Sequence, residues 1–390
     1  MTTITCVEDF KTLYRRRVPR MFYDYAESGS YTESTFRLNE QALQDLRIRQ
    51  RVGVDISRID TATTLAGEPA SLPIAFAPVG MLGIQHAAGE ICVARAAERC
   101  GVPFTLSTMS ICSLEQVAQE TRKPFWFQLY MVKDRGFVRD LIQRAKAARC
   151  SALVITMDLS MLGQRHKDVK NGLSIRPGLR HLLNIASKPR WAAQMARTPY
   201  KTFGNVVGHA KGVEDLNSLL TWAAEMVDPS LTWQDIEWVR NEWGGKIILK
   251  GIMDSEDARI AANMGIETLV VSNHGGRQLD GAGSTIEWLP RIAEATDGRV
   301  ELLMDSGIRS GMDIFRARAQ GASGVMLGRA MVYALGAMGE PGIDRLVEIL
   351  TKELTTTMGL AGVTRDADIT RSTLATGAPS PELPHLRVAN

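Results

Sequence analysis

The stretch ELLMDSGIRSGMDIFRARAQGASGVMLGR (301–329) has two short apolar runs on either side of a segment with helical periodicity. The runs are ELLMDSG (301–307) and GVMLGR (324–329), and the segment between them, SGMDIFRARAQG (310–321), ends in a glycine, as many helices do. Apolar runs that alternate with helical segments indicate parallel strands joined by crossover helices. The stretch is therefore predicted to form a strand, a helix and a second strand.

The same alternation recurs along most of the chain. The other apolar runs are LPIAFAP (72–78), PFTLST (103–108), PFWFQLY (124–130), ALVITMD (152–158), KIILKG (246–251) and ETLVVSN (267–273). The other helical segments are 89–101, 113–120, 135–150 and 255–265, and Gly101, Gly265 and Gly321 stand where helix C-caps belong. Eight such units in about 260 residues predict a (β/α)8 TIM barrel, because a doubly wound sheet rarely needs eight equal units. No G-x-G-x-x-G motif follows any of these runs, which weakens a dinucleotide-binding interpretation.

Two segments do not fit the repeat. Residues 1–70 are predicted to form an N-terminal helical cap, and residues 169–228 a long loop after the fourth strand, far longer than ordinary βα loops. Within that loop, residues 181–203 combine basic, aromatic and apolar residues and contain no acid. This mixture is typical of a helix that lies on an anionic membrane surface, and a mobile surface loop is the alternative. We expect residues 1–390 to form a single domain.

Composition excludes several classes of protein. The chain has 390 residues, 45% of them hydrophobic, and its formal net charge of +3 is too small to indicate a nucleic-acid-binding protein. Its five cysteines show no metal-binding spacing, and an odd number argues against a disulfide framework. The N-terminus lacks the apolar core of a signal peptide, and no run is long enough to span a bilayer. We expect an intracellular protein with no metal.

Polar residues gather where the predicted strands end. They are Ser107 and Thr108, Gln128 and Tyr130, Thr156 and Asp158, Lys250, Ser272, Asn273 and His274, Asp305 and Ser306, and Arg329, with Pro78, Val79, Gly80, Gly307 and Gly328 at the same positions. Barrel enzymes build their sites at the C-terminal ends of the strands. Polar side chains at most of these ends would be costly unless they face a pocket, so the sequence predicts a site there.

The last two strands are predicted to bind an anion. MDSGIRSG (304–311) and LGR (327–329) supply glycine N–H groups, helix N-termini and the charges of Arg309 and Arg329. Phosphate commonly binds at this place in TIM barrels. The alternative is that these glycines serve only tight turns.

The stretch SNHGGRQLDG (272–281) places a base and a guanidinium in one turn. Gly275 and Gly276 let the backbone turn tightly after His274, so that Arg277 faces the same mouth of the barrel. Asp158 is placed to accept a hydrogen bond from His274 and to stabilise its protonated form. Arg165 would be a second guanidinium, and the pair suits a substrate carboxylate. Lys250 would stabilise negative charge that develops on a cofactor ring, which points to an electron sink.

These motifs resemble those of the FMN-dependent enzymes that oxidise 2-hydroxy acids, a family with lactate and mandelate dehydrogenases and glycolate oxidases. The resemblance covers nearly the whole chain, from YDYAESGS (23–30) through APVG (77–80), WFQLY (126–130) and SNHGGRQLDG (272–281) to GVMLGR (324–329). Within this family, the chain most resembles the bacterial respiratory L-lactate dehydrogenases, through the segments PFTLSTMSICSLEQVA (103–118) and SLTWQDIEWVR (230–240). Met109 departs from the plant-type oxidases, which carry a tryptophan there, and this shapes a different pocket.

The resemblance implies FMN as the cofactor and a role for each site residue. Pro78, Val79, Gly80, Ser107, Gln128, Thr156, Lys250 and Ser272 would surround the ring and ribityl chain; Asp305, Gly307, Arg309, Gly328 and Arg329 would hold the ribityl and phosphate end. His274 would be the base with Asp158 as its partner, and Arg165, Arg277, Tyr25 and Tyr130 would bind the substrate. The implied reaction is oxidation of an L-2-hydroxy acid, above all L-lactate, to the 2-oxo acid.

The electron acceptor and the assembly follow from the resemblance in the same way. The favoured interpretation is a dehydrogenase that passes its electrons to a quinone or a similar acceptor and uses residues 181–203 to bind the membrane. The alternative is an oxygen-using oxidase or a mandelate-type dehydrogenase. An isopentenyl-diphosphate isomerase also binds FMN in a barrel, but it has no need of two carboxylate-binding arginines beside a base. A non-catalytic flavin-binding protein would have no need of His274 and Lys250. Relatives are often tetramers, which implies by analogy a homo-oligomer. The resemblance also implies a cytoplasmic protein, either free or peripheral on the cytoplasmic face of the inner membrane.

Overall fold

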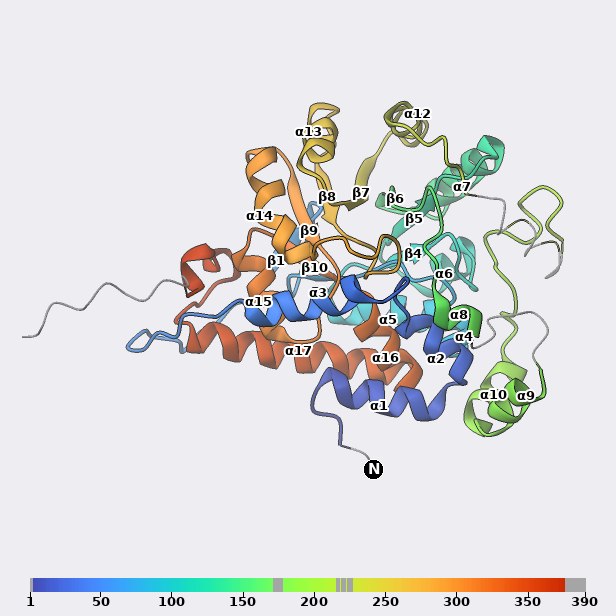
Figure 1. The fold of residues 1–390 in the computed structure, drawn as a ribbon, viewed down its shortest axis with the longest axis horizontal. Helices are drawn as coiled ribbons and strands as arrows, with labels where there is room; N and C mark the ends of the chain where they lie inside the picture. Colours follow the sequence, from blue (N-terminus) through green and yellow to red (C-terminus); the bar gives the residue numbers. More distant parts are fainter. Residues whose placement is uncertain (1–2, 171–177, 215–217, 219–221, 223–226, 376–390) are drawn as a thin grey trace, which may run out of the picture.

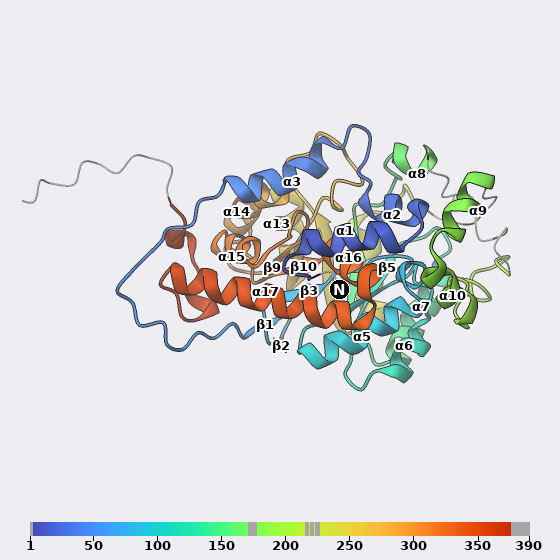
Figure 2. The ribbon, with the colours of Figure 1, turned by 90° about the horizontal axis from the view of Figure 1, so that it is seen from below.

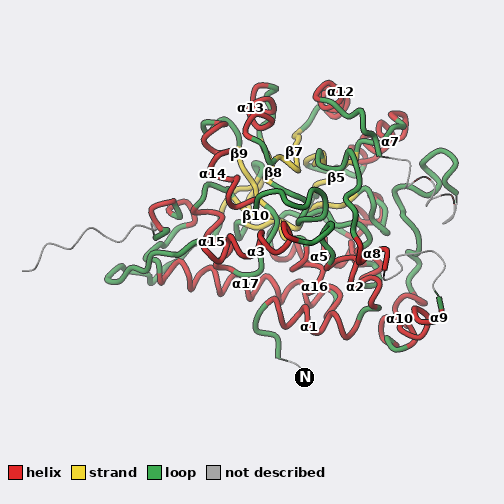
Figure 3. The backbone as a smooth tube through the Cα atoms, viewed as in Figure 1, coloured by secondary structure: helices red, strands yellow, loops and turns green. Residues whose placement is uncertain are grey.

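Eight parallel strands form the centre of the protein (Figures 1 and 3). The computed structural model describes residues 3–170, 178–214, 218, 222 and 227–375. The barrel strands are β3 (Ile74–Phe76), β4 (Thr105–Ser107), β5 (Trp126–Tyr130), β6 (Ala152–Thr156), β7 (Lys246–Ile252), β8 (Thr268–Val271), β9 (Glu301–Met304) and β10 (Gly324–Leu327). Each lies within or within one residue of a predicted run.

The sheet closes on itself. Its strand order is β3-β10-β9-β8-β7-β6-β5-β4, and its two edges meet because Phe76 pairs in parallel with Phe104. The N–H of Phe76 donates to the carbonyl of Pro103 at 2.8 Å. The predicted (β/α)8 TIM barrel is therefore confirmed.

Helices surround the strands, as Figure 3 shows. They are α4 (Leu82–Gln85), α5 (Gly89–Cys100), α6 (Leu114–Glu120), α7 (Arg135–Ala147), α12 (Trp233–Trp243), α13 (Ser255–Asn263), α14 (Thr285–Thr296), α15 (Gly311–Ala319), α16 (Arg329–Met338) and α17 (Glu340–Leu360). All five predicted helical segments are confirmed. Gly101, Gly265 and Gly321, just beyond α5, α13 and α15, have φ of 68°, 75° and 109°, as the predicted caps require.

The first 70 residues form three helices and a hairpin. The helices α1 (Val7–Arg17), α2 (Arg20–Glu27) and α3 (Ser34–Asp45) fit the predicted helical cap. The antiparallel strands β1 (Thr63–Leu65) and β2 (Glu68–Ala70) were not predicted. Leu65, Ala66 and Ala70 pack against apolar side chains of the barrel interior, so the hairpin closes one end of the barrel.

The segment after β6 leaves the barrel. It contains α8 (His166–Lys170), α9 (Leu179–Ala186) and α10 (Pro189–Arg197), and part of the predicted loop 169–228 lies outside the described residues. Figures 1 and 2 both place α9 and α10 at one end of the molecule, beside α1 and α2. No helix in the described part of the chain combines the length and the hydrophobicity needed to cross a bilayer.

Candidate active site

The inward-facing positions of the strands change from apolar to polar along the barrel axis. Trp126, Val154, Ile248, Val270, Leu303 and Met326 form the interior cluster next to the hairpin. Since side chains on one face of a strand recur every second residue, the next inward positions are Gln128, Thr156, Lys250, Ser272, Asp305 and Gly328. The alternation that builds the core therefore also brings the predicted polar groups to the C-terminal mouth.

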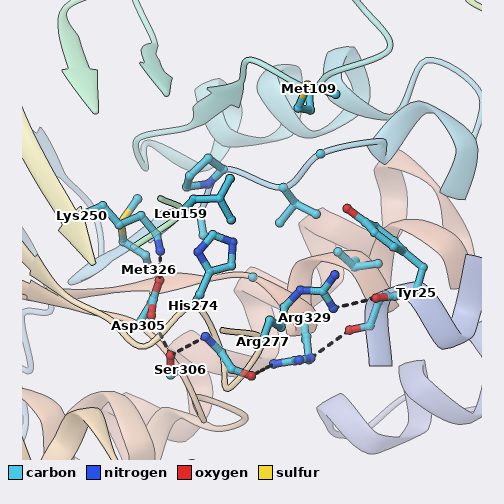
Figure 4. Close-up of a pocket in the computed structure, with 18 of the residues that line it drawn as sticks. Tyr25, Met109, Leu159, Lys250, His274, Arg277, Asp305, Ser306, Met326 and Arg329 are labelled. Carbon is cyan, nitrogen blue, oxygen red and sulfur yellow. Dashed lines mark hydrogen bonds and ion pairs between the residues drawn. The ribbon is translucent and has the colours of Figure 1, made fainter. Parts of the chain in front are cut away.

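Lys250 lies at the centre of this polar layer. Its Nζ is 2.9 Å from Oδ2 of Asp305 and donates to Oγ of Ser272 at 2.7 Å. Burial disfavours the charged amine, but the negative charges of Asp305 and Asp158 outweigh it and raise the pKa of Lys250. The amine is therefore a fixed positive charge at the floor of the mouth (Figure 4).

His274 follows β8 in a backbone conformation that is rare outside glycine. Its φ is 57°, and Gly275 and Gly276 continue the left-handed turn at 67° and 71°. Nδ1 of His274 is 2.9 Å from Oδ1 of Asp158. Burial raises the pKa of Asp158, but the charge of His274 and the hydrogen bond to it outweigh burial, so that this pKa lies below its ordinary value. Asp158 is thus an ionised carboxylate that orients the imidazole.

Two guanidiniums face the same space. Arg277 donates from Nη1 to the carbonyls of Tyr25 at 2.7 Å and Ser28 at 3.0 Å, and its Cζ lies 4.9 Å from the centre of the Tyr25 ring. Burial, together with the charges of Arg165 and Arg329, lowers the pKa of Arg277 to about 10. Figure 4 shows the His274 imidazole between Lys250 and the Arg277–Tyr25 pair.

Arg165 and Tyr130 complete this side of the cavity. Nε of Arg165 is 2.6 Å from Oδ2 of Asp168, and Oδ1 of the same carboxylate accepts a hydrogen bond from Oγ of Ser28 at 2.7 Å. The phenol of Tyr130 is partly buried, and burial raises its pKa. It therefore stays protonated and able to donate a hydrogen bond to a ligand.

The residues that are predicted to bind an anion lie at the ends of β9 and β10. Nη2 of Arg309 is 2.8 Å from Oε1 of Glu40, and Arg329 donates to three carbonyls, those of Ala26, Gly275 and Ser28. Arg329 has no carboxylate partner within the described part of the chain, and neither does Arg277. The cavity therefore holds more positive than negative charge.

Most predicted site residues line one cavity. They are Tyr25, Pro78, Val79, Gly80, Tyr130, Arg165, Lys250, His274, Arg277, Asp305, Gly307, Arg309, Gly328 and Arg329. Ser107, Gln128, Thr156, Asp158 and Ser272 lie behind this layer, where the first two are joined by a 2.9 Å hydrogen bond. Met109 also lines the cavity, on the side away from Asp305.

The residues fit the cofactor that the motifs imply. A phosphate would neutralise the unpaired guanidinium charge at β10. Nε2 of Gln128 is buried without a hydrogen-bond partner among the described residues, and a ring carbonyl would supply an acceptor. Both features match an anionic, acceptor-rich ligand such as FMN.

Sequence reasoning missed the apolar residues that line the cavity and the contacts behind it. Ala26, Leu159, Leu162, Met326 and Val332 contribute to the lining. Asp168, which holds Arg165, lies three residues after it, a spacing that signals an ion pair on one turn of helix. The partners of Arg309 and Arg329 had no comparable signal, because they are far away in the sequence.

Comparison with known proteins identifies the family. The model of the FMN-dependent dehydrogenases matches residues 14–376, so the chain belongs to this family and FMN is its cofactor. An L-lactate dehydrogenase of Caulobacter sp. (strain K31) is 46% identical over 379 residues, 95% of this chain and 98% of that protein. One of Actinobacillus pleuropneumoniae serotype 5b (strain L20) is 44% identical over 95% of this chain and 98% of its own length.

Solved structures give the same picture. The crystal structure of the monotopic membrane protein (S)-mandelate dehydrogenase covers 96% of this chain and 99% of its own, with a TM-score of 0.91 and 32% identity. A mandelate oxidase with (S)-4-hydroxymandelic acid covers 95% of this chain and 98% of its own, with a TM-score of 0.83 and 35% identity. The fold and the family are thus established by independent comparisons.

Proposed function

We propose that the protein oxidises L-lactate to pyruvate with FMN as its cofactor and passes the electrons to a quinone. The observation that carries the proposal is that His274, which is hydrogen-bonded to Asp158, lines one cavity together with Arg277. The relatives named L-lactate dehydrogenase, at 44–46% identity over nearly the whole chain, support the choice of substrate.

The substrate carboxylate would bind between Arg277 and Arg165. Their mutual repulsion in a buried site contributes to the lowered pKa of Arg277, and a carboxylate between them removes that cost. Tyr25 and Tyr130, which line the same wall, would hydrogen-bond the substrate. This arrangement presents the substrate Cα and hydroxyl to the imidazole.

His274 would act as the base. It takes a proton from either the Cα or the hydroxyl group, and in both cases the imidazole becomes a cation beside the Asp158 carboxylate. Bound FMN supplies the two-electron acceptor for this oxidation. Lys250 would contribute a fixed positive charge next to the cofactor ring.

The remaining site residues are assigned to the cofactor. Pro78, Val79, Gly80, Ser107, Gln128, Thr156, Lys250 and Ser272 would contact its ring and ribityl chain, and Asp305, Gly307, Arg309, Gly328 and Arg329 its phosphate end. In this assignment, the Arg309 guanidinium would bind both the Glu40 carboxylate and the phosphate.

We also propose that the protein lies on the cytoplasmic face of the inner membrane, held by residues 181–203. In helix α9, which begins two residues before this segment, Leu179, Leu182 and Leu183 are 73%, 52% and 63% exposed, and Arg180, Lys188 and Arg190 lie near them in the sequence. Exposed leucines beside basic side chains suit an anionic bilayer surface. The similarity to a monotopic mandelate dehydrogenase supports this placement.

Co-sedimentation with anionic vesicles tests the membrane proposal. Leu182→Ser/Leu183→Ser should remain soluble in the presence of vesicles that sediment the parent. Leu279→Ser is the matched control, because Leu279 is also exposed, at 71%, but lies on another loop. Equal sedimentation of all three proteins would contradict the proposal.

An oxygen-using oxidase or a mandelate-type dehydrogenase is the alternative that the mandelate oxidase and mandelate dehydrogenase neighbours favour. The match to the FMN-dependent dehydrogenases does not support the isopentenyl-diphosphate isomerase alternative.

We further propose that residues 1–390 act as one FMN-binding barrel domain, with the cap at 1–70 and the loop at 169–228, and that the chain forms a homotetramer. Light scattering of the purified protein tests the assembly.

The visible spectrum of the purified protein tests the proposed function. Flavin absorbance should bleach when L-lactate is added without oxygen, return quickly with a quinone and return slowly with air. Fast recovery in air would favour the oxidase. Bleaching by mandelate but not by lactate would favour the mandelate-type alternative.

A further inference from the structure

The His274 turn is held from outside the barrel by the N-terminal cap. Asn39 of α3 and Asn273, the residue before His274, are 2% and 6% exposed. Nδ2 of Asn39 donates to Oδ1 of Asn273 at 3.0 Å, and Nδ2 of Asn273 donates to Oδ1 of Asn39 at 2.8 Å. Two buried amides therefore form a closed, reciprocal pair across 234 positions of sequence.

The pair is also tied to the backbone on both sides of the turn. Oδ1 of Asn273 accepts from the N–H of Gly276 at 3.1 Å, and its Nδ2 donates to the carbonyl of Gly283 at 3.2 Å. These two contacts fix the positions of the oxygen and the nitrogen of the Asn273 amide. A partner must therefore donate to that oxygen and accept from that nitrogen, as a second amide can. Asn39 supplies that second amide.

The residues between these contacts need such support. His274 has a positive φ of 57°, which a side chain with a Cβ adopts only when the surroundings impose it. From the same cap, the N–H of Ser30 donates to the carbonyl of Gly276 at 2.9 Å, and Asp280 accepts from the N–H groups of Thr32 and Thr35. The cap thus forms hydrogen bonds with residues before, within and after the turn, namely Asn273, Gly276 and Asp280.

We propose that Asn39 is a positioning residue for the reaction: its amide holds Asn273, and through Asn273 the strained turn that aims His274 at the substrate and at Asp158. Asn39 does not line the cavity, so it acts only through this pair. The inference rests on the proposed role of His274 as the base.

Kinetics separate positioning from folding. Asn39→Ala should slow anaerobic reduction of the flavin by L-lactate about tenfold to hundredfold, the cost of a base displaced by a fraction of an ångström. Pyruvate binding should change much less, because Arg277 is anchored independently on the carbonyls of Tyr25 and Ser28. A parental rate in Asn39→Ala would overturn the inference.

A second variant gives a pH signature that packing alone cannot produce. In Asn39→Asp, the protonated carboxyl can donate to Oδ1 of Asn273 and restore the pair, whereas the ionised carboxylate places two acceptors face to face. Burial favours the protonated form. The ratio of its reduction rate to the parental rate should therefore rise as the pH falls, and a ratio independent of pH would overturn the inference.

Gln85→Glu is the matched control. Gln85 is a buried amide that also joins the cap to the barrel: it accepts from the Tyr14 hydroxyl at 2.6 Å and donates to the carbonyl of Phe22, and these hydrogen bonds do not reach residues 272–283. It should lower stability without a pH-dependent rate ratio. Hydrogen exchange of residues 272–283 adds a measurement that needs no turnover: it should speed up in Asn39→Ala and not in Gln85→Glu, and unchanged exchange in Asn39→Ala would overturn the inference. If the parent is not reduced by L-lactate, the proposed function fails, and hydrogen exchange still decides whether Asn39 holds the turn.

Discussion

Asp158→Asn tests the electrostatic part of the mechanism. The carboxylate lies 2.9 Å from Nδ1 of His274, and the side chains of Asp158 and His274 are only 14% and 21% exposed. A histidine that acts as a base must accept the proton as a neutral imidazole. In the proposed mechanism, the attraction between two full charges therefore exists only once His274 has taken the proton. The interaction therefore stabilises the transition state more than the bound substrate, which is the condition for a catalytic effect.

The size of the effect follows from the separation. Two unit charges about 4 Å apart, at an effective dielectric constant of about 20, attract by about 4 kcal/mol. An amide in place of the carboxylate removes this attraction, and about 4 kcal/mol corresponds to about a thousandfold in rate. Because Arg277 and Arg165 are untouched, pyruvate should still bind.

Anaerobic stopped-flow measurement of flavin reduction is the assay. Reduction of Asp158→Asn by L-lactate should be about a thousandfold slower than in the parent, with the flavin content unchanged. Asp366→Asn is the control, since Asp366 is a buried carboxylate paired with Arg318 outside the cavity. A rate in Asp158→Asn close to that of the control would refute the reasoning.

Four further outcomes are expected. His274→Gln should keep its FMN and its yellow colour but not be bleached by any 2-hydroxy acid; rapid bleaching by lactate would remove His274 from the role of base. Arg277→Met should weaken pyruvate binding about tenfold to hundredfold, the worth of a charge-assisted hydrogen bond, and an unchanged dissociation constant would count against the carboxylate clamp. Asp280→Asn should destabilise the protein most above about pH 4. Burial raises the pKa of Asp280, but hydrogen bonds from Thr32, Thr35 and Ser34 outweigh burial and lower this pKa in the folded state, so the stability that the carboxylate adds is lost as the pH falls below the pKa of the unfolded state. Urea unfolding at several pH values measures the difference in the free energy of unfolding between the variant and the parent, and a difference that grows in acid would contradict the prediction. Removal of FMN should lower the melting temperature, and added inorganic phosphate should restore part of it, because Arg329 lacks a carboxylate partner among the described residues; no recovery would argue against phosphate binding there.

The barrel was predictable because its signal is local. Each strand from β3 to β10 is a short apolar run, and the polar residue that follows it is adjacent in sequence, so Lys250, His274 and Asp305 could be placed at the mouth without a structure. The β1–β2 hairpin could not, because strands of three residues are too short to show a period and one of them contains Pro69.

The contacts behind the mouth could not be predicted for a different reason. Glu40 beside Arg309 and Asn39 beside Asn273 join positions more than 230 residues apart, and nothing in either local sequence marks the other. Asp280 lies in the same motif as His274, yet its task of capping the start of α3 is visible only once that helix is docked. Such contacts depend on tertiary packing, which periodicity does not report.

The barrel and the cap therefore divide the work. The strands set the height of the polar groups along the barrel axis. Since every second side chain of a strand faces inward, Lys250 lies one inward position beyond the apolar Ile248. His274 cannot be delivered in this way, since its φ of 57° lies outside any strand conformation and no strand hydrogen bond can hold it. The turn needs partners from another element, and Ser30, Asn39 and the residues bound to Asp280 all come from the cap. Without the first 70 residues of this chain, Asp158 and Arg329 would still hold His274 and the carbonyl of Gly275. Every contact from the cap to the turn would be lost, so we expect the proposed base to be held less firmly.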